Sequence, residues 1–235
     1  YNGTKYFSHI IIHENKDEGV GPNTNANSNM RGMRSGKDNI RMAWKNQTRA
    51  DAYNLSPFDK TLLLDADYFV FDNMLDILFD TDKNVLCGRH VEEISYQDFL
   101  IDYDRIHHQS IELYWATVLY FTKSNESKML FDIMNWVKKN WQYFSKLYKF
   151  EASRNFRNDY AVSIAIHMLQ GKVENKEYAL PFKLMCLADK NIMLDSQKFV
   201  YRYKNDWSGS RLPIQNVHVM NKQSAHVISQ EIING

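Results

Sequence analysis

The stretch TLLLDADYFV, residues 61–70, constrains the fold more than any other part of this sequence. Its leucines and its aromatic end are typical of a strand in the protein interior, yet Asp65 and Asp67 interrupt it two positions apart. Residues i and i+2 of a strand share one face, so the two carboxylates would lie side by side and repel each other. The sequence therefore predicts that a cation neutralises both groups at the edge of a buried strand.

The composition indicates a single domain over residues 1–235. Apolar residues make up 44% of the chain and charged residues 24%, which is ordinary for a globular protein. The net charge of +1 provides no overall attraction to nucleic acid or to an anionic membrane, so we expect a local site to carry the function. No apolar run approaches the roughly 20 residues of a membrane span, and no signal peptide is visible. With only Cys87 and Cys186 present, a reducing compartment and a cytoplasmic location are favoured.

The pattern of apolar residues predicts an α/β fold in which helices flank a mainly parallel sheet. Strands are expected at residues 6–13, 61–70, 85–91, 112–123, 198–203 and 216–221. Helices are expected at residues 40–55, 71–80, 127–148 and 158–171, the last of them closed by Gly171. Residues 14–39 are rich in Gly, Asn and Ser and are predicted to form a long loop.

The paired carboxylates suit a divalent cation. Hard oxygen ligands favour Mg²⁺ or Mn²⁺, and open α/β sheets bind their ligands at the carboxyl ends of the strands. The alternative is that one aspartate begins a turn while the other caps a neighbouring element. Because a buried run precedes the pair, we favour the metal. The repulsion between Asp65 and Asp67 also predicts that alanine at either position leaves the fold stable.

The segment RADAYNLSPFDKTLLLDADYFV, residues 49–70, resembles the core of the GT-A glycosyltransferases, and of their family 8 members in particular. In those enzymes a helical arginine precedes a P-[FY]-[DE]-[KR] turn and a strand that ends in D-x-D. The resemblance implies a Rossmann-like GT-A sheet and a nucleotide-sugar donor, with UDP-sugars favoured. It also implies that Asp65 and Asp67 hold Mn²⁺ or Mg²⁺ against the donor diphosphate.

The same resemblance implies further contacts to the donor. Arg49 would reach the diphosphate, and Lys45, one helical turn earlier, would share its face; a solvated helix face is the alternative for both. Asp65 and Ala66 of the motif are also expected to contact the donor. YWATVLYF, residues 114–121, is similar to the family's [YF]-x-[NS]-[AS]-G-V strand. The donor sugar is therefore expected beside residues Ala116 and Thr117.

The C-terminal part of the chain extends the resemblance. VHVMNK, residues 217–222, is similar to the family pattern H-[FY]-x-G-x-x-K without its glycine. This similarity implies that His218 is a third metal ligand and that Lys222 binds phosphate. A purely structural role is the alternative for the histidine.

RNDYA, residues 157–161, is similar to the [NF]-x-D-[QY] start of a family helix, which implies that Asp159 and Asn158 are the catalytic residues. Asp159 would orient the sugar in a retaining enzyme, which is the favoured stereochemistry, or act as the base in an inverting one. Its alternative role, and that of Asn158, is to cap the helix.

Three other functions stay open at this stage. LLLDADYFV also resembles the first motif of the haloacid-dehalogenase phosphatases, in which Asp65 would be the nucleophile and Asp67 the general acid, although Phe69 stands where Thr or Val is usual. A nucleotidyltransferase and a non-catalytic module that binds sugar nucleotides are the other two. GT-A domains begin with a strand, a helix and a strand, whereas this chain starts near the second or third strand, so we expect the first strand to be lacking. The acceptor is not indicated by any motif.

Overall fold

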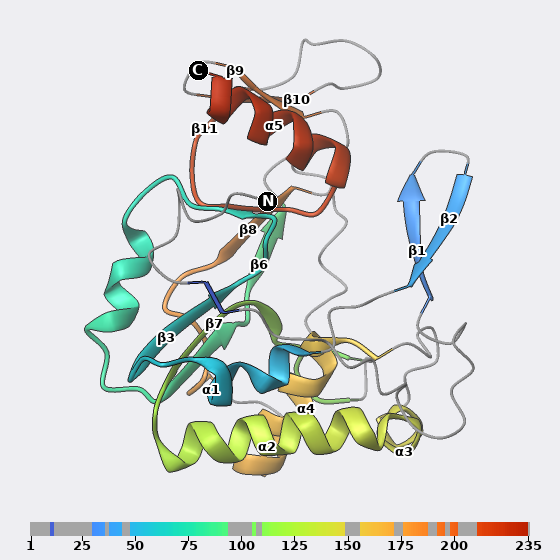
Figure 1. The fold of residues 1–235 in the computed structure, drawn as a ribbon, viewed down its shortest axis with the longest axis vertical. Coiled ribbons are helices and arrows are strands. Elements are labelled where there is room, and N and C mark those ends of the chain that lie inside the picture. The colour runs from blue at the N-terminus through green and yellow to red at the C-terminus, as the bar shows by residue number, and fades with distance from the viewer. Residues whose placement is uncertain are drawn as a thin grey trace.

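The computed structural model describes residues 10–11, 30–35, 38–43, 48–93, 105–106, 110–148, 156–171, 176–187, 192–195, 198–201 and 211–234. Helices pack on sheets with both parallel and antiparallel strands, so the chain is mixed α/β (Figure 1). Among the described strands only β12–β8 and β6–β8 are parallel pairs. The expectation of a mainly parallel sheet is therefore wrong. The other described strand pairs are antiparallel, both between strands adjacent in the sequence, such as β1 and β2, and between strands far apart in it, such as β3 and β7.

Two sheets form the centre of the molecule. The first has the order β3-β7-β5, with β3 at Lys60–Leu64, β7 at Trp115–Thr122 and β5 at Val85–Gly88. The second has the order β4-β12-β8-β6, with β4 at Tyr68–Phe69, β12 at Val217–Val219, β8 at Leu184–Leu187 and β6 at Val91–Glu93. The chain passes from the first sheet to the second between β3 and β4 and again between β5 and β6. The D-x-D residues lie in the first of these two crossings.

β7 is buried on both faces and carries a bulge beside the D-x-D turn. Its side chains alternate between the two core clusters that lie on either side of the sheet. The pairing with β5 jumps from Leu119 opposite Cys87 to Trp115 opposite Gly88. The bulge therefore removes Ala116 from the ladder with β5, and bulges of this kind often redirect groups toward a site.

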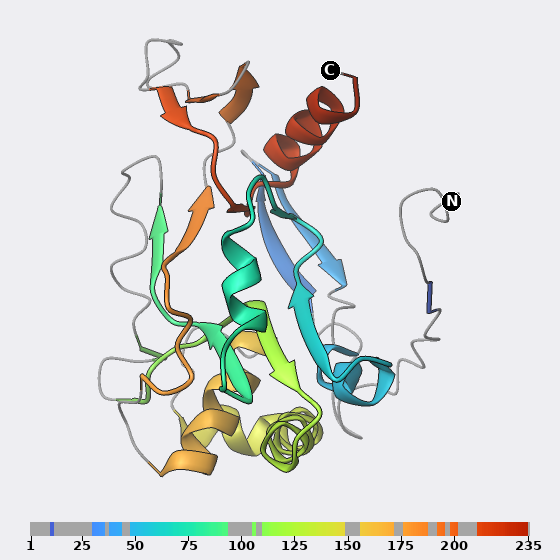
Figure 2. The ribbon, with the colours of Figure 1, turned by 90° about the vertical axis from the view of Figure 1, so that its left-hand side faces the viewer.

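Helices cover one face of the first sheet. α2 (Asn125–Lys139) and α4 (Asn158–Gln170) share a core cluster with β5 and β7, and Figure 2 shows α2 end-on beneath these strands. Ser124 caps α2 by accepting a hydrogen bond from the Ser127 N–H at 3.2 Å. Gly171 ends α4 at a φ of 64°, which confirms the predicted stop. The helix predicted over 127–148 is divided at Asn140 into α2 and α3 (Trp141–Leu147).

The helix predicted over 40–55 is wrong in its first part. β1 (Met30–Ser35) and β2 (Asp38–Ala43) form an antiparallel hairpin, which also occupies part of the loop predicted at 14–39. Among the described residues of this segment, helical structure begins at the 3₁₀ turn η2 (Thr48–Asp51), which leads into α1 (Ala52–Leu55). In the hairpin, the backbone N–H and C=O groups of each strand bond to the other strand. The spacing of apolar residues within one segment does not reveal such a partner strand, so the prediction of a helix failed here.

The remaining elements largely follow the expected strands. Those predicted at 85–91, 112–123, 198–203 and 216–221 correspond to β5 with β6, β7, β10 (Lys198–Tyr201) and β12. Of the strand predicted at 6–13, only residues 10–11 are described, and they are not in a strand. The helix predicted at 71–80 is the 3₁₀ helix η3 (Met74–Phe79).

A third sheet and a C-terminal helix complete the described fold. β9 (Ile192–Asp195), β10 and β11 (Arg211–Pro213) form this sheet in the order β11-β10-β9. α5 (Lys222–Asn234) contacts β9 and β12. None of the helices in the described residues is long and apolar enough to cross a membrane.

Candidate metal centre

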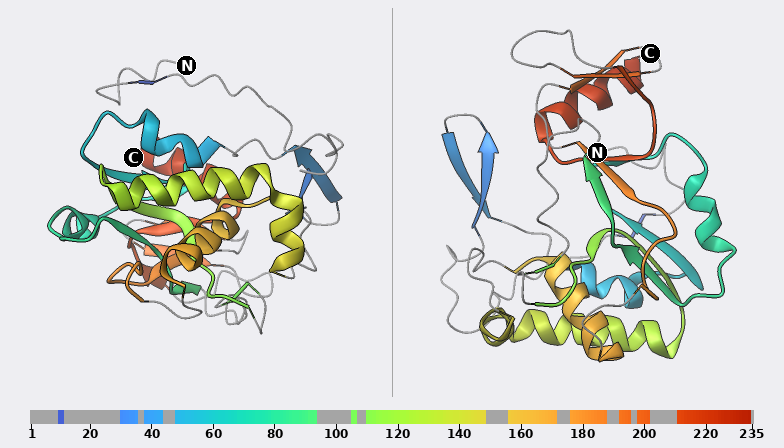
Figure 3. Two further views of the ribbon diagram at one scale, coloured as in Figure 1. Left: turned by 90° about the horizontal axis from the view of Figure 1, so that it is seen from below. Right: turned by 180° about the vertical axis from the view of Figure 1, so that it is seen from behind.

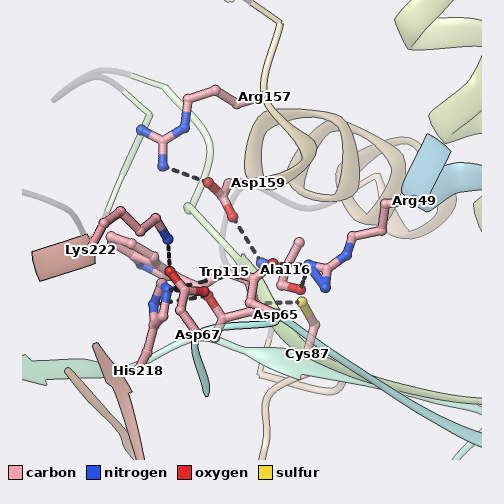
Figure 4. Close-up of polar contacts among 11 residues, drawn as sticks. Arg49, Asp65, Asp67, Cys87, Trp115, Ala116, Arg157, Asp159, His218 and Lys222 are labelled. Atoms are coloured by element: carbon pink, nitrogen blue, oxygen red, sulfur yellow. Dashed lines mark hydrogen bonds and ion pairs between the residues drawn. The ribbon is translucent and has the colours of Figure 1, made fainter. Parts of the chain in front are cut away.

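Asp65 and Asp67 lie in a tight turn between β3 and β4. The Asp65 N–H donates to the Thr117 carbonyl oxygen at 3.0 Å, and the Tyr68 N–H donates to the Asp65 carbonyl oxygen at 3.0 Å. The Val219 N–H donates to the Asp67 carbonyl oxygen at 2.9 Å, which ties the turn to the second sheet. The expected continuous strand is therefore wrong, but the turn still brings both carboxylates to one place (Figure 4).

β12 is held against this turn by contacts that span most of the chain. The Asn216 side-chain oxygen accepts hydrogen bonds from the N–H groups of Phe71 at 2.6 Å and Asp72 at 3.1 Å. His218 then lies opposite Tyr68 in the antiparallel pair of β12 with β4. This register places the histidine beside the D-x-D carboxylates.

His218 completes a group of three residues that could hold a metal ion. Its Nε2 lies 3.2 Å from Asp67 Oδ1 and 3.9 Å from Asp65 Oδ2, and one ligand atom from each residue lies within 4.8 Å of the others. Its Nδ1 lies 3.3 Å from the hydroxyl of Thr117, which orients Nε2 toward the carboxylates. The two carboxylate oxygens suit Mn²⁺ or Mg²⁺, and the imidazole nitrogen favours Mn²⁺ of the two. The donor set therefore agrees with the metal ligands that the sequence predicted.

Two cationic side chains flank the carboxylates on the two sides seen in Figure 4. Arg49 is buried; its Nη1 lies 3.0 Å from Asp65 Oδ1 and also donates to the Ala116 carbonyl oxygen. Lys222, the first residue of α5, pairs with Asp67 through a side chain that is 58% exposed. The repulsion between the carboxylates is therefore offset by two positive charges, one fixed by burial and one on a mobile stem.

The bulge in β7 is filled by charged side chains. The Ala116 N–H donates to Asp159 Oδ1 at 2.9 Å, while its carbonyl oxygen accepts from Arg49. These two contacts satisfy the backbone groups that the bulge removes from the ladder. Arg157 donates to the other carboxylate oxygen of Asp159 at 2.6 Å. Sequence reasoning selected Asp159 and missed Arg157; a basic residue two positions before an acidic one at a helix start was the available signal.

The contacts of Asp159 determine its ionisation. Burial raises the pKa of this carboxyl, but the charge of Arg157 and the hydrogen bond from the Ala116 N–H outweigh burial and lower the pKa below its ordinary value. Asp159 is therefore ionised at neutral pH, with both oxygens engaged. A carboxylate with a lowered pKa is a weak general base, so its geometry favours a positioning role.

We expect acid to remove the stability that Asp159 contributes. Because its folded pKa lies below its unfolded pKa, the carboxylate stabilises the fold above about pH 4, and this contribution is lost as the pH falls through the folded pKa. Urea unfolding of wild type and Asp159→Asn should show a difference in unfolding free energy that is full near neutral pH and shrinks below about pH 4. A difference that does not change with pH would contradict this assignment.

The structure places the other predicted site residues as follows. Ala66 is exposed at the tip of the D-x-D turn, whereas Ala116 and Thr117 are buried in β7. Asn158 is the buried first residue of α4. Lys45 lies outside the described residues. Thr117 thus acts on His218 through its hydroxyl, a role that sequence reasoning did not assign.

Replacing Thr117 with valine should lower Mn²⁺ affinity about 10–100-fold, because valine keeps the shape of the side chain but removes the hydroxyl that orients His218. Isothermal titration calorimetry with MnCl₂ measures this change. Thr122→Val is the matched control on the same strand, since its hydroxyl bonds Asn84 at 2.9 Å and does not contact the metal group. Equal losses in the two variants would show that the Thr117 contact does not orient the ligand.

Segments far apart in the chain meet at this centre: η2, the D-x-D turn, the bulge of β7, the start of α4 and the junction of β12 with α5. Such convergence of charged groups is typical of a ligand site. The chain matches no protein-family model, no curated protein and no solved structure in the three comparisons made with known proteins.

Proposed function

We propose that this chain is a metal-dependent glycosyltransferase of GT-A type, which transfers a sugar from a nucleotide-sugar donor to an acceptor. The observation that carries the proposal is that Asp65, Asp67 and His218 meet between two cations, Arg49 and Lys222. The D-x-D resemblance selects the same five residues from the sequence. The mixed α/β architecture agrees with a GT-A domain, and the Rossmann-like form of the sheet is part of the proposal.

Asp65, Asp67 and His218 would hold Mn²⁺ or Mg²⁺. When bound, such an ion supplies Lewis-acid stabilisation for the charge that develops on the departing nucleoside diphosphate. Arg49 keeps Asp65 in place and contributes fixed positive charge beside the diphosphate. Lys222 has a largely exposed ammonium group on a flexible stem, so it can leave Asp67 and contact a phosphate oxygen.

Asp159 and its neighbour Asn158 are assigned to the donor sugar in this proposal. Arg157 and the Ala116 N–H hold the Asp159 carboxylate in one orientation, which suits a residue that positions hydroxyl groups. The lowered pKa of Asp159 makes it a weak base. Such a positioning role is the one that Asp159 has in a retaining reaction, so retention is part of the proposal.

The test is a hydrolysis screen of UDP-, GDP- and TDP-sugars, with released nucleoside diphosphate measured in the presence of MnCl₂ and of excess chelator. We expect at least one donor, with UDP-sugars first, to be hydrolysed only with the metal. The anomeric configuration of the released sugar, followed by NMR at early times, should be retained. Absence of any metal-dependent turnover and of any nucleotide binding would overturn the proposal.

Assays with other substrates separate the alternative functions. A phosphatase would release inorganic phosphate from a phosphomonoester, and a nucleotidyltransferase would release pyrophosphate from a nucleoside triphosphate. A non-catalytic module would bind Mn²⁺ and a nucleoside diphosphate without turnover. A cytoplasmic location belongs to the proposal, since both cysteines are free, buried thiols and suit a reducing compartment.

A further inference from the structure

The outer side of α2 and α3 carries large apolar side chains that the core does not use. Trp136 is 47% exposed, Tyr143 60% and Leu147 56%. Tyr143 and Leu147 are four positions apart on α3 and so share one side of that helix. The ring centroids of Trp136 and Tyr143 lie 4.9 and 5.2 Å from that of Phe144, so the exposed side chains gather where α2 meets α3. The inward sides of both helices already fill the core through other residues, including Met134 and Phe144.

Lysines lie among these apolar side chains. Lys138, Lys139 and Lys146 belong to α2 and α3, and the sequence between Ile133 and Tyr148 contains no acidic residue. This concentration of positive charge contrasts with the net charge of +1 for the whole chain. The first half of α2 is different, because its Lys128 pairs with Asp132 at 2.7 Å.

We propose that the basic apolar face of α2 and α3, defined by Trp136, Lys139, Tyr143, Lys146 and Leu147, docks on the surface of an anionic lipid bilayer. Exposed Trp, Tyr and Leu enter the boundary between headgroups and acyl chains, while lysine ammonium groups contact lipid phosphates. A partner that was only acidic would be matched by the lysines without the apolar side chains. Single-stranded nucleic acid is typically held in grooves, whereas these residues lie on the exposed outer side of two helices.

The face lies apart from the metal centre. In Figures 1 and 3, α2 and α3 lie at the end of the molecule opposite α5, and Lys222 of the metal centre is the first residue of α5. Docking through the outer side of α2 and α3 therefore leaves α5, with Lys222, on the side away from the bilayer. The inference consequently does not depend on which reaction that centre catalyses.

Vesicle flotation tests the proposal. The chain should float with vesicles of phosphatidylcholine and phosphatidylserine, sediment with phosphatidylcholine alone, and lose binding as the salt concentration rises. Lys139→Gln/Lys146→Gln should lower the partition coefficient about 30-fold. Trp136→Ala/Leu147→Ala should lower it about tenfold or more, through loss of the apolar insertion.

Exposed residues elsewhere provide matched controls. Lys176→Gln/Lys198→Gln removes the same charge from other surfaces, and Ile233→Ala truncates a side chain that is 71% exposed on α5. Both should bind vesicles as wild type does, and thermal melts should show that every variant is folded. The proposal is overturned if anionic vesicles are not bound at low salt, or if the controls lose as much binding as the α2–α3 variants. It is equally overturned if the face binds single-stranded RNA or an acidic polypeptide in place of vesicles.

Discussion

Asp67→Asn is expected to reduce Mn²⁺-dependent donor turnover by more than about 100-fold. Replacing a residue that only orients a metal ligand already lowers metal affinity or activity by up to about 100-fold, and Asp67 is itself a proposed ligand. Asparagine keeps the size of the side chain but removes its charge, so it weakens both the attraction for the ion and the contact with His218. We expect the variant to fold, since Lys222, the cationic partner of Asp67, is largely exposed to solvent. Released nucleoside diphosphate measures the loss.

A thermal melt separates loss of binding from loss of chemistry. Mn²⁺ together with UDP should raise the melting temperature of the wild type by mass action, and the rise should be absent in Asp67→Asn. Asp76→Asn is the matched control, because Asp76 is exposed on η3 and does not belong to the metal group. An Asp67→Asn variant that retained both turnover and the melting shift would refute the metal assignment.

Asp65→Ala is expected to destabilise the folded chain by about 2–3 kcal/mol, in contrast to the expectation from simple repulsion between the two aspartates. Arg49 is only 7% exposed, and its guanidinium pairs with Asp65 at 3.0 Å. Removing Asp65 leaves a buried positive charge without its carboxylate, and this penalty exceeds the repulsion that is relieved. Asp67→Ala should cost less than about 1 kcal/mol, because its cation is Lys222 at the surface.

Urea unfolding without metal measures both free energies. The double variant Arg49→Met/Asp65→Leu removes the two charges together and should recover most of the loss seen in Asp65→Ala, since no unpaired ion stays buried. Equal stability of Asp65→Ala and Asp67→Ala would show that the Arg49 pair does not hold the turn. The two aspartates thus contribute differently to the free energy of unfolding, because Arg49, the partner of Asp65, is buried and Lys222, the cationic partner of Asp67, is exposed.

Local pattern was sufficient for elements with a long and regular run of apolar residues. α4 could be predicted because its apolar residues are followed by Gly171, which adopts a φ of 64° as the helix stop requires. β7 could be predicted because a continuous apolar and aromatic run is typical of a strand covered on both faces. The hairpin of β1 and β2 could not, because each strand is specified by its partner and not by its own periodicity.

In the candidate site, too, some features could be predicted from the sequence and others could not. Asp65 and Asp67 could be selected from the sequence because two carboxylates interrupt a buried apolar run, and His218 because VHVMNK resembles a family pattern. The contact of Asp159 with β7 could not be predicted, because it depends on the bulge that turns the Ala116 N–H toward α4.

By itself, then, the sequence determined which segments form the central strand and the covering helices, and it singled out the side chains that are proposed to bind a cation. Only the tertiary structure decided that Arg49 is the buried counter-ion of Asp65, and that Thr117 orients His218. The physical reason is that periodicity and residue chemistry act within a few neighbouring positions. Charge compensation and ligand orientation, in contrast, depend on distances between segments that meet only when the two sheets assemble.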